Sequence, residues 1–307
     1  MIIETIPNIS EGRRAGVVSA ITDAVRAVEG AELLDVSSDT SHNRSVLTVA
    51  GRASALSEAM LAMFEQAVAL IDLREHTGVH PRLGAVDVVP FVPIHQVTLA
   101  DCDALAKRVG ALVAERFQIP VYLYEASATS ESRRRLEHIR RGQFEGLTEK
   151  MLAPEWVPDF GPRVPHPTAG ASIIGARMPL IAYNVNLNTS HIDVAKDIAV
   201  TIRESSGGLR HVKAMGVRLE DRGIVQVSMN LTDYRVTGMR EVFDAIAREA
   251  ERRHVRIVES ELIGLVPEAA LTIDDARHIQ LGDFAPHRTI EGRLREVEKF
   301  KTLKVEK

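Results

Sequence analysis

The chain has one cysteine, no long apolar run and little net charge, and each absence excludes a class of protein. A single cysteine, Cys102, excludes an internal disulfide framework and a cysteine-rich metal site. No apolar run approaches the roughly 20 residues that span a bilayer, so we expect no membrane helix. The formal net charge of −4 gives no general attraction to nucleic acid or anionic membranes. The first residues lack a basic stretch followed by an apolar one, so we expect no signal peptide and a cytoplasmic protein.

The 307 residues are enough for one large domain or two of ordinary size, and the order of the predicted elements favours two. In the first half, the apolar spacing predicts a strand, a helix, two strands, a helix and a strand. They lie at 2–8, about 13–28, 32–37, 45–50, 53–72 and 86–92. This β-α-β-β-α-β order is that of the ferredoxin-like unit. A helix at about 99–116 and a strand at 121–124 extend it.

Proline and glycine are dense from 153 to 175, which predicts a long ordered loop between the two halves. After this loop the same element order returns. The strands are predicted at 180–187, 213–217, 224–231 and 255–259, and the helices at about 190–205 and 237–253. We therefore predict an α+β protein of two ferredoxin-like subdomains, 1–178 and 179–307. The charge-rich residues from about 288 predict an exposed helix.

Amide side chains share one face of two strands in the second half. Period-2 alternation places Asn184 and Asn186 of the strand 180–187 opposite its apolar residues, and Gln226 has the same place in 224–231. The two strands are expected to be central neighbours. This amide-rich face is either an ordinary solvated sheet face or a floor that faces a ligand, which the low β-propensity of asparagine favours.

The run from His76 to Ala85 places a histidine in a loop bounded by glycine and proline, directly before the predicted strand 86–92. Loops held by a rigid scaffold often carry catalytic side chains. Pro81 biases the backbone of His80 away from helix, and the histidine side chain titrates near neutral pH. The pattern predicts a positioned acid–base group. A histidine that only hydrogen-bonds within its loop is the alternative.

Neither a metal nor a nucleophilic serine is predicted from the remaining motifs. His76 and His80 are four residues apart, which on a helix would make both available as metal ligands, but Gly78 and Pro81 argue against a helix. The segment Gly170–Gly175 holds a serine between glycines without the spacing of a hydrolase nucleophile elbow. We predict a glycine-rich connection there.

Three polar side chains beside the predicted loops are candidates for binding a carboxylate. The polar cluster 38–44 between two strands predicts a turn, in which Asn43 and Arg44 would supply donors at the end of the sheet. Arg82 lies in the histidine loop. Arginine binds a carboxylate through two parallel hydrogen bonds. A solvated side chain is the alternative for each arginine.

Seven short motifs, in their order and spacing, resemble the formiminotransferase family (glutamate formimidoyltransferase) over essentially the whole chain. They are PNISEG at 7–12, NRSV at 43–46, HPRLGAVDV at 80–88, PVYLY at 120–124, WVPDFGP at 156–162, AYNVNL at 182–187 and GLVP at 264–267. Any one of these strings is a weak signal, and the set is specific.

The resemblance implies transfer of the formimino group from N-formimino-L-glutamate to tetrahydrofolate in histidine degradation, giving 5-formiminotetrahydrofolate and L-glutamate. It implies a substrate groove between the two subdomains, tetrahydrofolate as co-substrate, no metal, and His80 as the catalytic acid–base. It also implies a run of folate contacts. These are Gly161, Pro162, Arg163, Val164, Pro165, His166, Pro167, Thr168, Ala169 and Gly170.

Eight further residues are candidates for binding the substrates. They are Asn8, Glu11, Asp39, Asn43, Arg44, Arg82, Asn184 and Asn186. We expect Asp39 or Glu11 to orient the His80 ring or to favour its charged form. We expect the arginines and asparagines to bind substrate carboxylates and the edges of the pterin.

The chain departs from the animal members in two places. Ser37 stands where they have an acidic residue, and Asp39, two residues on, offers a replacement carboxylate. Within the folate segment several residues differ from theirs. These are Arg163, Val164, Pro165, His166 and Ala169.

The resemblance also carries expectations about partners. No cyclodeaminase part follows the transferase motifs, so we expect a separate cyclodeaminase, together with a homodimer and no nucleic-acid or membrane partner. Exchange of a formyl group between 5-formyltetrahydrofolate and glutamate is the nearest alternative reaction. A non-catalytic folate-binding protein and a metal-dependent amidohydrolase are the other two alternatives.

Overall fold

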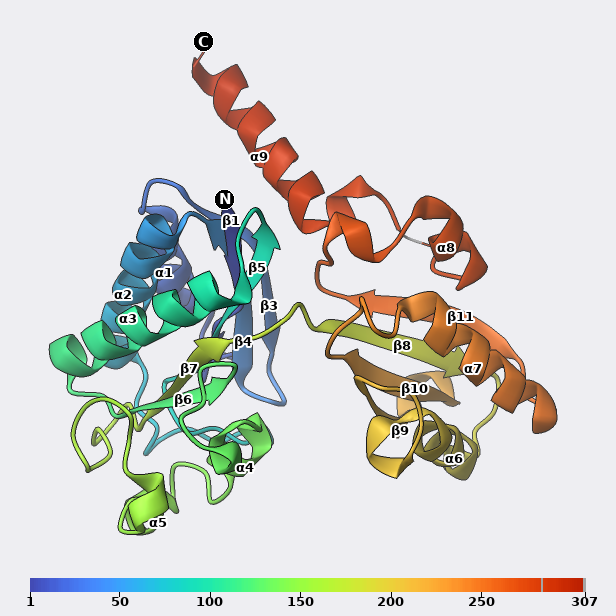
Figure 1. Ribbon diagram of the computed structural model, residues 1–307, viewed down its shortest axis with the longest axis horizontal. Coiled ribbons are helices and arrows are strands. Elements are labelled where there is room, and N and C mark those ends of the chain that lie inside the picture. The colour runs from blue at the N-terminus through green and yellow to red at the C-terminus, as the bar shows by residue number, and fades with distance from the viewer. Residues whose placement is uncertain (283, 306–307) are drawn as a thin grey trace. The chain divides into compact units, whose positions relative to one another are not determined.

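The computed structural model describes residues 1–282 and 284–305, without the side chains of 221 and 298–305. The chain divides into two compact units, Met1–Arg177 and Met178–Lys307, each with a sheet of its own (Figure 1). The mixed α+β class predicted from the sequence is confirmed. Among the described residues, no helix is both long and apolar enough to cross a membrane.

On one side of the sheet of the first unit, neighbouring strands are antiparallel. β3 (Ala31–Asp39) pairs with β4 (Arg44–Gly51). The next position in the sheet, between β4 and β5 (Val86–His95), is shared by β1 (Ile2–Thr5) and β2 (Asn8–Ile9). The sequence predicts one strand at 2–8, whereas the structure has two short ones. Pro7 lies between them, and proline has no N–H to donate to a ladder.

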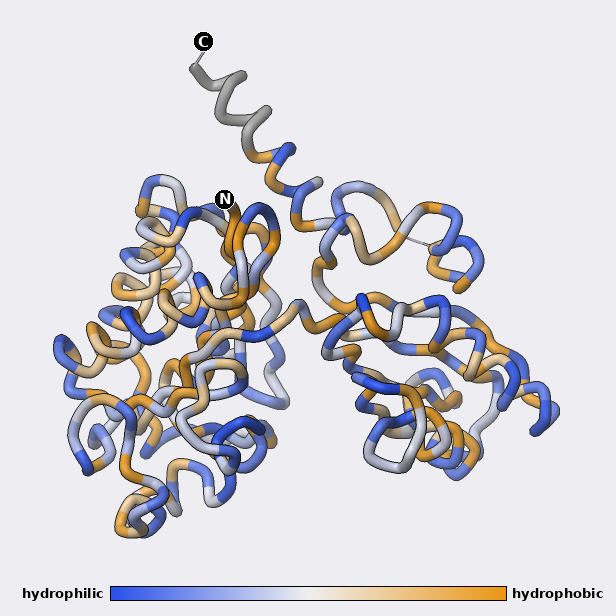
Figure 2. Tube along the Cα trace, in the orientation of Figure 1, coloured by the Kyte–Doolittle hydropathy of each residue, from blue (hydrophilic) through white to orange (hydrophobic). Residues whose placement is uncertain are grey.

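Three helices pack on this sheet and bury most of the apolar side chains of the first unit. They are α1 (Ala15–Arg26), α2 (Ala53–Leu70) and α3 (Leu99–Phe117). Figure 1 shows them side by side next to the sheet, and in Figure 2 hydrophobic and hydrophilic residues alternate along them. Val25, Met60 and Phe64 are fully buried in this core. The apolar residues that recur at helical spacing therefore lie on the faces of these helices that are turned toward the sheet.

Two parallel strands extend the sheet beyond β5. β7 (Ser172–Ala176) lies between β5 and β6 (Val121–Glu125), with α4 (Leu136–Arg140) and α5 (Leu147–Lys150) in the connection before it. The prediction of a glycine-rich connection at 170–175 is wrong for this strand. All five residues of β7 are buried. A Cβ on Gly175 would lie 2.3 Å from the Tyr124 carbonyl oxygen, so this glycine permits close strand packing rather than flexibility.

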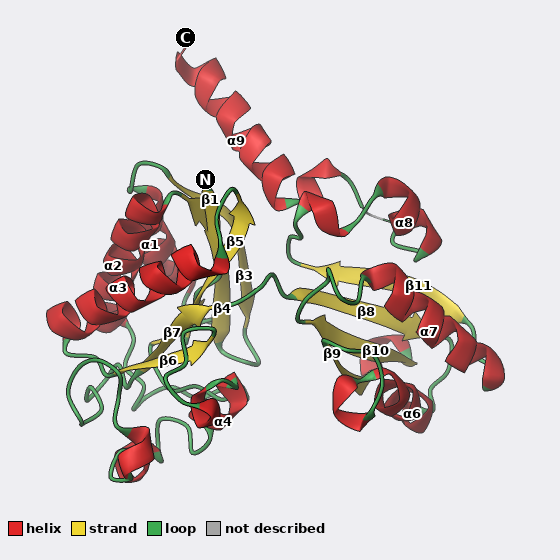
Figure 3. Ribbon diagram, in the orientation of Figure 1, coloured by secondary structure: helices red, strands yellow, loops and turns green. Residues whose placement is uncertain are grey.

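The second unit has a four-stranded antiparallel sheet in the order β11-β8-β10-β9 (Figure 3). Its elements alternate as β-α-β-β-α-β, as predicted. They are β8 (Ile181–Leu187), α6 (Ile192–Ile202), β9 (Val212–Leu219), β10 (Ile224–Leu231), α7 (Met239–Arg252) and β11 (Ile257–Ile263). β11 ends four residues beyond the predicted strand at 255–259. The helices α8 (Ile273–His278) and α9 (Ile290–Val305) follow.

The predicted central pair of this sheet is confirmed. β8 and β10 are antiparallel neighbours, with Asn186 opposite Gln226 and Val185 opposite Val227. Val185 and Val227 are fully buried in the apolar core that α6 and α7 cover. Strand alternation therefore sets the amide side chains on the other face.

Candidate active site

The loop that carries His80 connects α2 to β5 and is fixed by a side chain from the β3–β4 turn. Asn43, whose φ of 50° is in the left-handed region that asparagine tolerates, accepts a hydrogen bond from the Gly12 N–H at 2.9 Å. Its Nδ2 donates to the Thr77 carbonyl oxygen at 3.0 Å, and its own carbonyl oxygen lies 2.9 Å from Nε2 of His76. Asn43 and His76 therefore hold the loop in place.

His80 is buried, with 7% of its surface exposed, between a cation and a carboxylate. Nη1 of Arg44 lies 3.4 Å from Nδ1, and Oδ2 of Asp87 lies 3.7 Å from Nε2, an ion-pair separation longer than a hydrogen bond. A guanidinium donates hydrogen bonds and cannot accept them. The neutral ring that fits these neighbours has its lone pair on Nδ1 and its proton on Nε2, toward Asp87.

Asp87 is a fully buried carboxylate on the apolar strand β5. Its Oδ1 accepts the Leu83 N–H at 2.6 Å, and its Oδ2 forms an ion pair with Arg140 of α4. Burial by itself would raise the pKa of this carboxyl. The charge of Arg140 and the contacts with His80 and Leu83 outweigh burial and hold that pKa below its ordinary value. Asp87 is therefore an anion beside the imidazole.

His80 is held in its neutral, basic form near pH 7. Burial lowers the pKa of the imidazole, and the positive charges of Arg140 and Arg44 lower it further, against the opposing effect of Asp87. A neutral histidine can accept a proton, and a nearby carboxylate can stabilise the imidazolium that results. The arrangement defines an acid–base site.

The two carboxylates expected to support His80 are engaged elsewhere. Both Glu11 oxygens are used at the start of α1, where they accept the N–H groups of Arg13 and Arg14 at 2.8 Å and pair with the Arg14 side chain at 2.5 Å. Asp39 is exposed and pairs with His42, whose Nδ1 is 3.0 Å away. Asp87 takes the position next to His80 instead.

Sequence reasoning quoted Asp87 only as part of a motif and gave no role to Arg140. The signal for Asp87 was present, because a carboxylate flanked by valines on a buried strand needs a charged partner. Arg140 could not be found in the same way, since it is one of several arginines in a polar segment.

Arg82 and Asn8, two of the predicted substrate contacts, make internal hydrogen bonds. Arg82 is buried and donates to Glu145 at 2.7 Å and to the His76 carbonyl oxygen at 3.2 Å. It thereby ties the His80 loop to the segment after α4. Asn8 donates from Nδ2 to the Ile6 carbonyl oxygen at 3.1 Å, beside the proline that separates β1 from β2.

The predicted folate segment, Gly161–Gly170, lies against the backbone of the His80 loop. The Thr168 carbonyl oxygen accepts the Leu73 N–H at 2.8 Å, and the Ala169 carbonyl oxygen accepts the Ala85 N–H at 3.0 Å. Both ends of the histidine loop are therefore bonded to this segment.

A tight turn shapes the end of the folate segment. His166 and Gly170 exchange two backbone hydrogen bonds of 2.9 Å, and Nδ1 of His166 accepts the Ala169 N–H at 3.0 Å. Arg163 donates to two carbonyl oxygens after α5, while the Val164 side chain is exposed. The middle of the segment thus offers side chains to solvent while its end is fixed.

The amide face of the second unit is occupied by carboxylates of β11. Nδ2 of Asn186 donates to Glu259 at 3.1 Å and to Glu261 at 2.8 Å. Nε2 of Gln226 donates to the Asn186 oxygen at 2.8 Å and to Glu261 at 3.0 Å. Sequence reasoning gave neither glutamate a role: Glu261 lies beyond the predicted strand 255–259, and Glu259 is the last residue of that strand. Arg222 completes the network 2.7 Å from Glu259.

Within the described part of the chain, no group of three or more His, Cys, Asp or Glu residues is placed to hold a metal ion. Cys102 is fully buried in α3, and burial raises the pKa of its thiol to about 12. A thiol with so high a pKa is a packing group rather than a nucleophile.

A buried, neutral histidine beside a carboxylate, on a two-unit α+β scaffold, has the chemistry that proton transfer requires. Comparison with known families assigns residues 2–177 to "Formiminotransferase domain, N-terminal subdomain" and residues 182–282 to "Formiminotransferase domain". The chain belongs to the formiminotransferase family.

Named relatives match over most of the chain. A "Glutamate formimidoyltransferase" of Streptococcus pyogenes is 45% identical over 94% of this chain and 97% of its own length. One of Thermoplasma acidophilum is 45% identical over 95% of this chain and 97% of its own. The rat "Formimidoyltransferase-cyclodeaminase" is 42% identical over 88% of this chain, which matches 51% of that longer protein.

Proposed function

We propose that this protein transfers the formimino group of N-formimino-L-glutamate to N5 of tetrahydrofolate, giving 5-formiminotetrahydrofolate and L-glutamate in histidine degradation. Relatives that carry the name of this activity match almost the whole chain at 45% identity. The observation that carries the proposal is the neutral, buried His80 next to Asp87, because the reaction needs one group that accepts a proton and returns it.

The reaction moves one proton and exchanges one carbon–nitrogen bond. N5 of tetrahydrofolate attacks the amidine carbon, and a tetrahedral intermediate forms. His80 takes the proton that N5 loses. It then gives this proton to the glutamate nitrogen as the bond from that nitrogen to the amidine carbon breaks. Proton transfer by a positioned group contributes about 10²–10⁴-fold in rate.

Asp87 and Arg44 act on the two sides of the imidazole. Asp87 faces Nε2 and stabilises the imidazolium while His80 holds the extra proton. Arg44 lies at Nδ1 and lowers the pKa of the ring, which favours release of the proton to the leaving nitrogen. Because Asp87 acts through His80, it is a positioning residue rather than a catalytic one.

The binding of both substrates is proposed for the surfaces around this pair. The buried Nε atoms of Arg44, Arg82 and Arg140 all lack an acceptor among the described residues. Arg82 and Arg140 already pair with Glu145 and Asp87, whereas Arg44 has no ion pair there, so Arg44 is the arginine most suited to a substrate carboxylate. We assign the folate to the segment Gly161–Gly170, whose backbone is bonded to the His80 loop. Holding two reactants beside one acid–base group accounts for much of the expected acceleration.

The remaining expectations from the resemblance stay proposals. These are a homodimer, a cytoplasmic location, substrate contacts at Asn184 and Asn186, and a separate cyclodeaminase that consumes the product.

An assay with tetrahydrofolate and N-formimino-L-glutamate tests the proposal. We expect an absorbance change from an acid-labile 5-substituted folate, and a loss of about 10²–10⁴-fold in kcat for His80→Gln. His95→Gln, on the exposed end of β5, is the matched control and should keep its rate. N-formyl-L-glutamate, run in parallel, identifies a formyl donor. Near-normal turnover by a folded His80→Gln protein would refute the role of His80.

A further inference from the structure

A cavity opens in the first unit, at the end of β5 away from His80. It has a volume of 740 Å³, within the range of small-molecule sites. The register of the sheet fixes its distance from His80. β1 begins opposite His95, whereas β2 ends opposite Val86, next to the His80 loop. A ten-residue strand separates the two places by about 30 Å.

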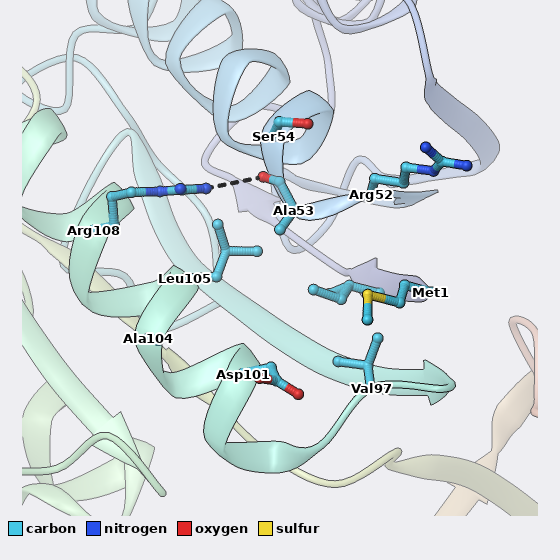
Figure 4. A pocket seen from close by; sticks show the side chains of 10 residues that line it. Met1, Arg52, Ala53, Ser54, Val97, Asp101, Ala104, Leu105 and Arg108 are labelled. Atoms are coloured by element: carbon cyan, nitrogen blue, oxygen red, sulfur yellow. Dashed lines mark hydrogen bonds between the residues drawn. The ribbon is translucent and has the colours of Figure 1, made fainter.

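Apolar side chains form the floor and one wall of this cavity. Ile3 and Leu105 are buried beneath it, and Val97 and the exposed Met1 stand beside it. In Figure 4, Leu105 lies between Arg108 on one side and Met1 and Val97 on the other, and Arg52 lies above Met1. A ligand that covers the exposed Met1 side chain would be stabilised, because burial of apolar surface favours binding.

The rim of the cavity has more positively than negatively charged side chains. Asp101 is the one carboxylate, and its Oδ2 is already engaged by the Thr98 N–H and hydroxyl at the start of α3. Arg108 donates from Nη2 to the Ala53 carbonyl oxygen at 3.3 Å and keeps its other N–H groups for a ligand. The exposed side chain of Arg52 has no ion pair or hydrogen bond within the part of the chain that the structure describes, and only its backbone carbonyl oxygen accepts a hydrogen bond, from the Leu56 N–H at 3.0 Å.

The potential at the rim is therefore positive. Arg52 precedes α2, whose first turn has no acidic residue and no side-chain cap, so the backbone there adds partial positive charge. An apolar cavity with two arginines at its rim is complementary to a molecule that has an apolar body and one anionic end.

We propose that this cavity, lined by Ile3, Arg52, Val97, Leu105 and Arg108, binds an amphipathic carboxylate, its chain over Leu105 and Val97 and its carboxylate at the guanidinium of Arg52. The site is separate from the acid–base centre and does not depend on the proposed function.

Calorimetric titration of the full chain with dodecanoate tests the chemistry of the ligand. We expect one saturable site per chain, no binding of acetate, which lacks the chain, and much weaker binding of dodecyltrimethylammonium, which has the opposite charge. Arg52→Gln should weaken dodecanoate binding about tenfold, the effect of losing one charge-assisted hydrogen bond. Equal binding of the anionic and cationic amphiphiles would overturn the proposal.

Two tryptophan variants test the location. Ala104 is exposed and lines the cavity, so Ala104→Trp should fill it and abolish dodecanoate binding. Ala100 is exposed on the same helix outside the cavity, and Ala100→Trp should bind like the parent protein. Unchanged binding by a folded Ala104→Trp protein would contradict the site. Sedimentation gives a second test. If Ala104→Trp dissociates a dimer and Ala100→Trp does not, the cavity is occupied by a second copy of the chain, and the proposal is wrong.

Discussion

Asp87 places a buried negative charge beside His80, and the isosteric Asp87→Asn change removes that charge while keeping an acceptor for the Leu83 N–H. We expect kcat to fall about 10²-fold and KM to stay constant, because Asp87 contacts His80 and not the substrate. The pKa of His80 should fall further, since Asp87 raises it. The acid limb of the kcat/KM profile should therefore move to lower pH, measured from about pH 5 to 8.

A second buried ion pair of the first unit supplies the control for Asp87→Asn. Asp159 accepts from Arg133 at 2.8 Å, and these side chains are 8% and 7% exposed, compared with 1% for Asp87 and 13% for Arg140. Breaking either pair strands a charge and should cost about 3–5 kcal/mol of unfolding free energy. Only Asp87→Asn should move the acid limb. If Asp159→Asn moves it equally, Asp87 has a merely structural role.

Single residues were predictable to the extent that their chemistry shows in the local sequence. His80 was predicted to be a positioned acid–base group because proline and glycine frame it in a loop before a strand, and the structure places it in that loop before β5. Arg82 was correctly placed in the loop, but its partner Glu145 lies 63 positions away, and no local pattern reveals such a contact. The same holds for the pair of Asp87 and Arg140, which only the tertiary fold brings together.

The hydrogen bonds between the Gly161–Gly170 segment and the His80 loop give a prediction for a single glycine. Gly170 has a φ of 67°, and a Cβ there would lie 2.2 Å from the Leu83 carbonyl oxygen. Gly170→Ala should therefore lower the free energy of unfolding in two ways, through backbone strain and through displacement of the histidine loop. We expect a loss of more than about 2 kcal/mol of unfolding free energy together with a loss of activity.

Gly264 is the matched control for Gly170. Its φ of 76° is similar, but no atom lies within 4 Å of the Cβ position. Gly264→Ala should cost only the strain, about 1–2 kcal/mol, and leave activity unchanged. Chemical denaturation and the transferase assay measure both effects. Equal losses in the two variants would show that contact with Leu83 contributes nothing.

The helices and strands were largely predictable because each buries one face. α1, α2 and α3 follow apolar residues at helical spacing, and β8 and β10 follow strict alternation. β7 was not predictable in this way, since its five residues are buried on both faces and include a glycine. Parallel strands covered on both sides lose the alternation that marks other strands.

The histidines whose pKa values are shifted all lie in the first unit. Three histidines have lowered pKa values, His76, His80 and His166, and burial is the main cause for each. All three lie in the His80 loop or the segment bonded to it. The unfolded chain, with histidine pKa values near 6.5, therefore binds protons more readily than this part of the folded protein does.

The stability of the protein should accordingly depend on pH in one direction. The stabilisation is complete above the unfolded pKa of about 6.5 and is lost as pH falls toward the lower folded values. We expect the urea midpoint to decrease between about pH 7 and 5.5. The double variant His76→Gln and His166→Gln should show a shallower decrease, because two of the three groups no longer titrate. Identical slopes would mean that the burial of these histidines does not govern acid sensitivity.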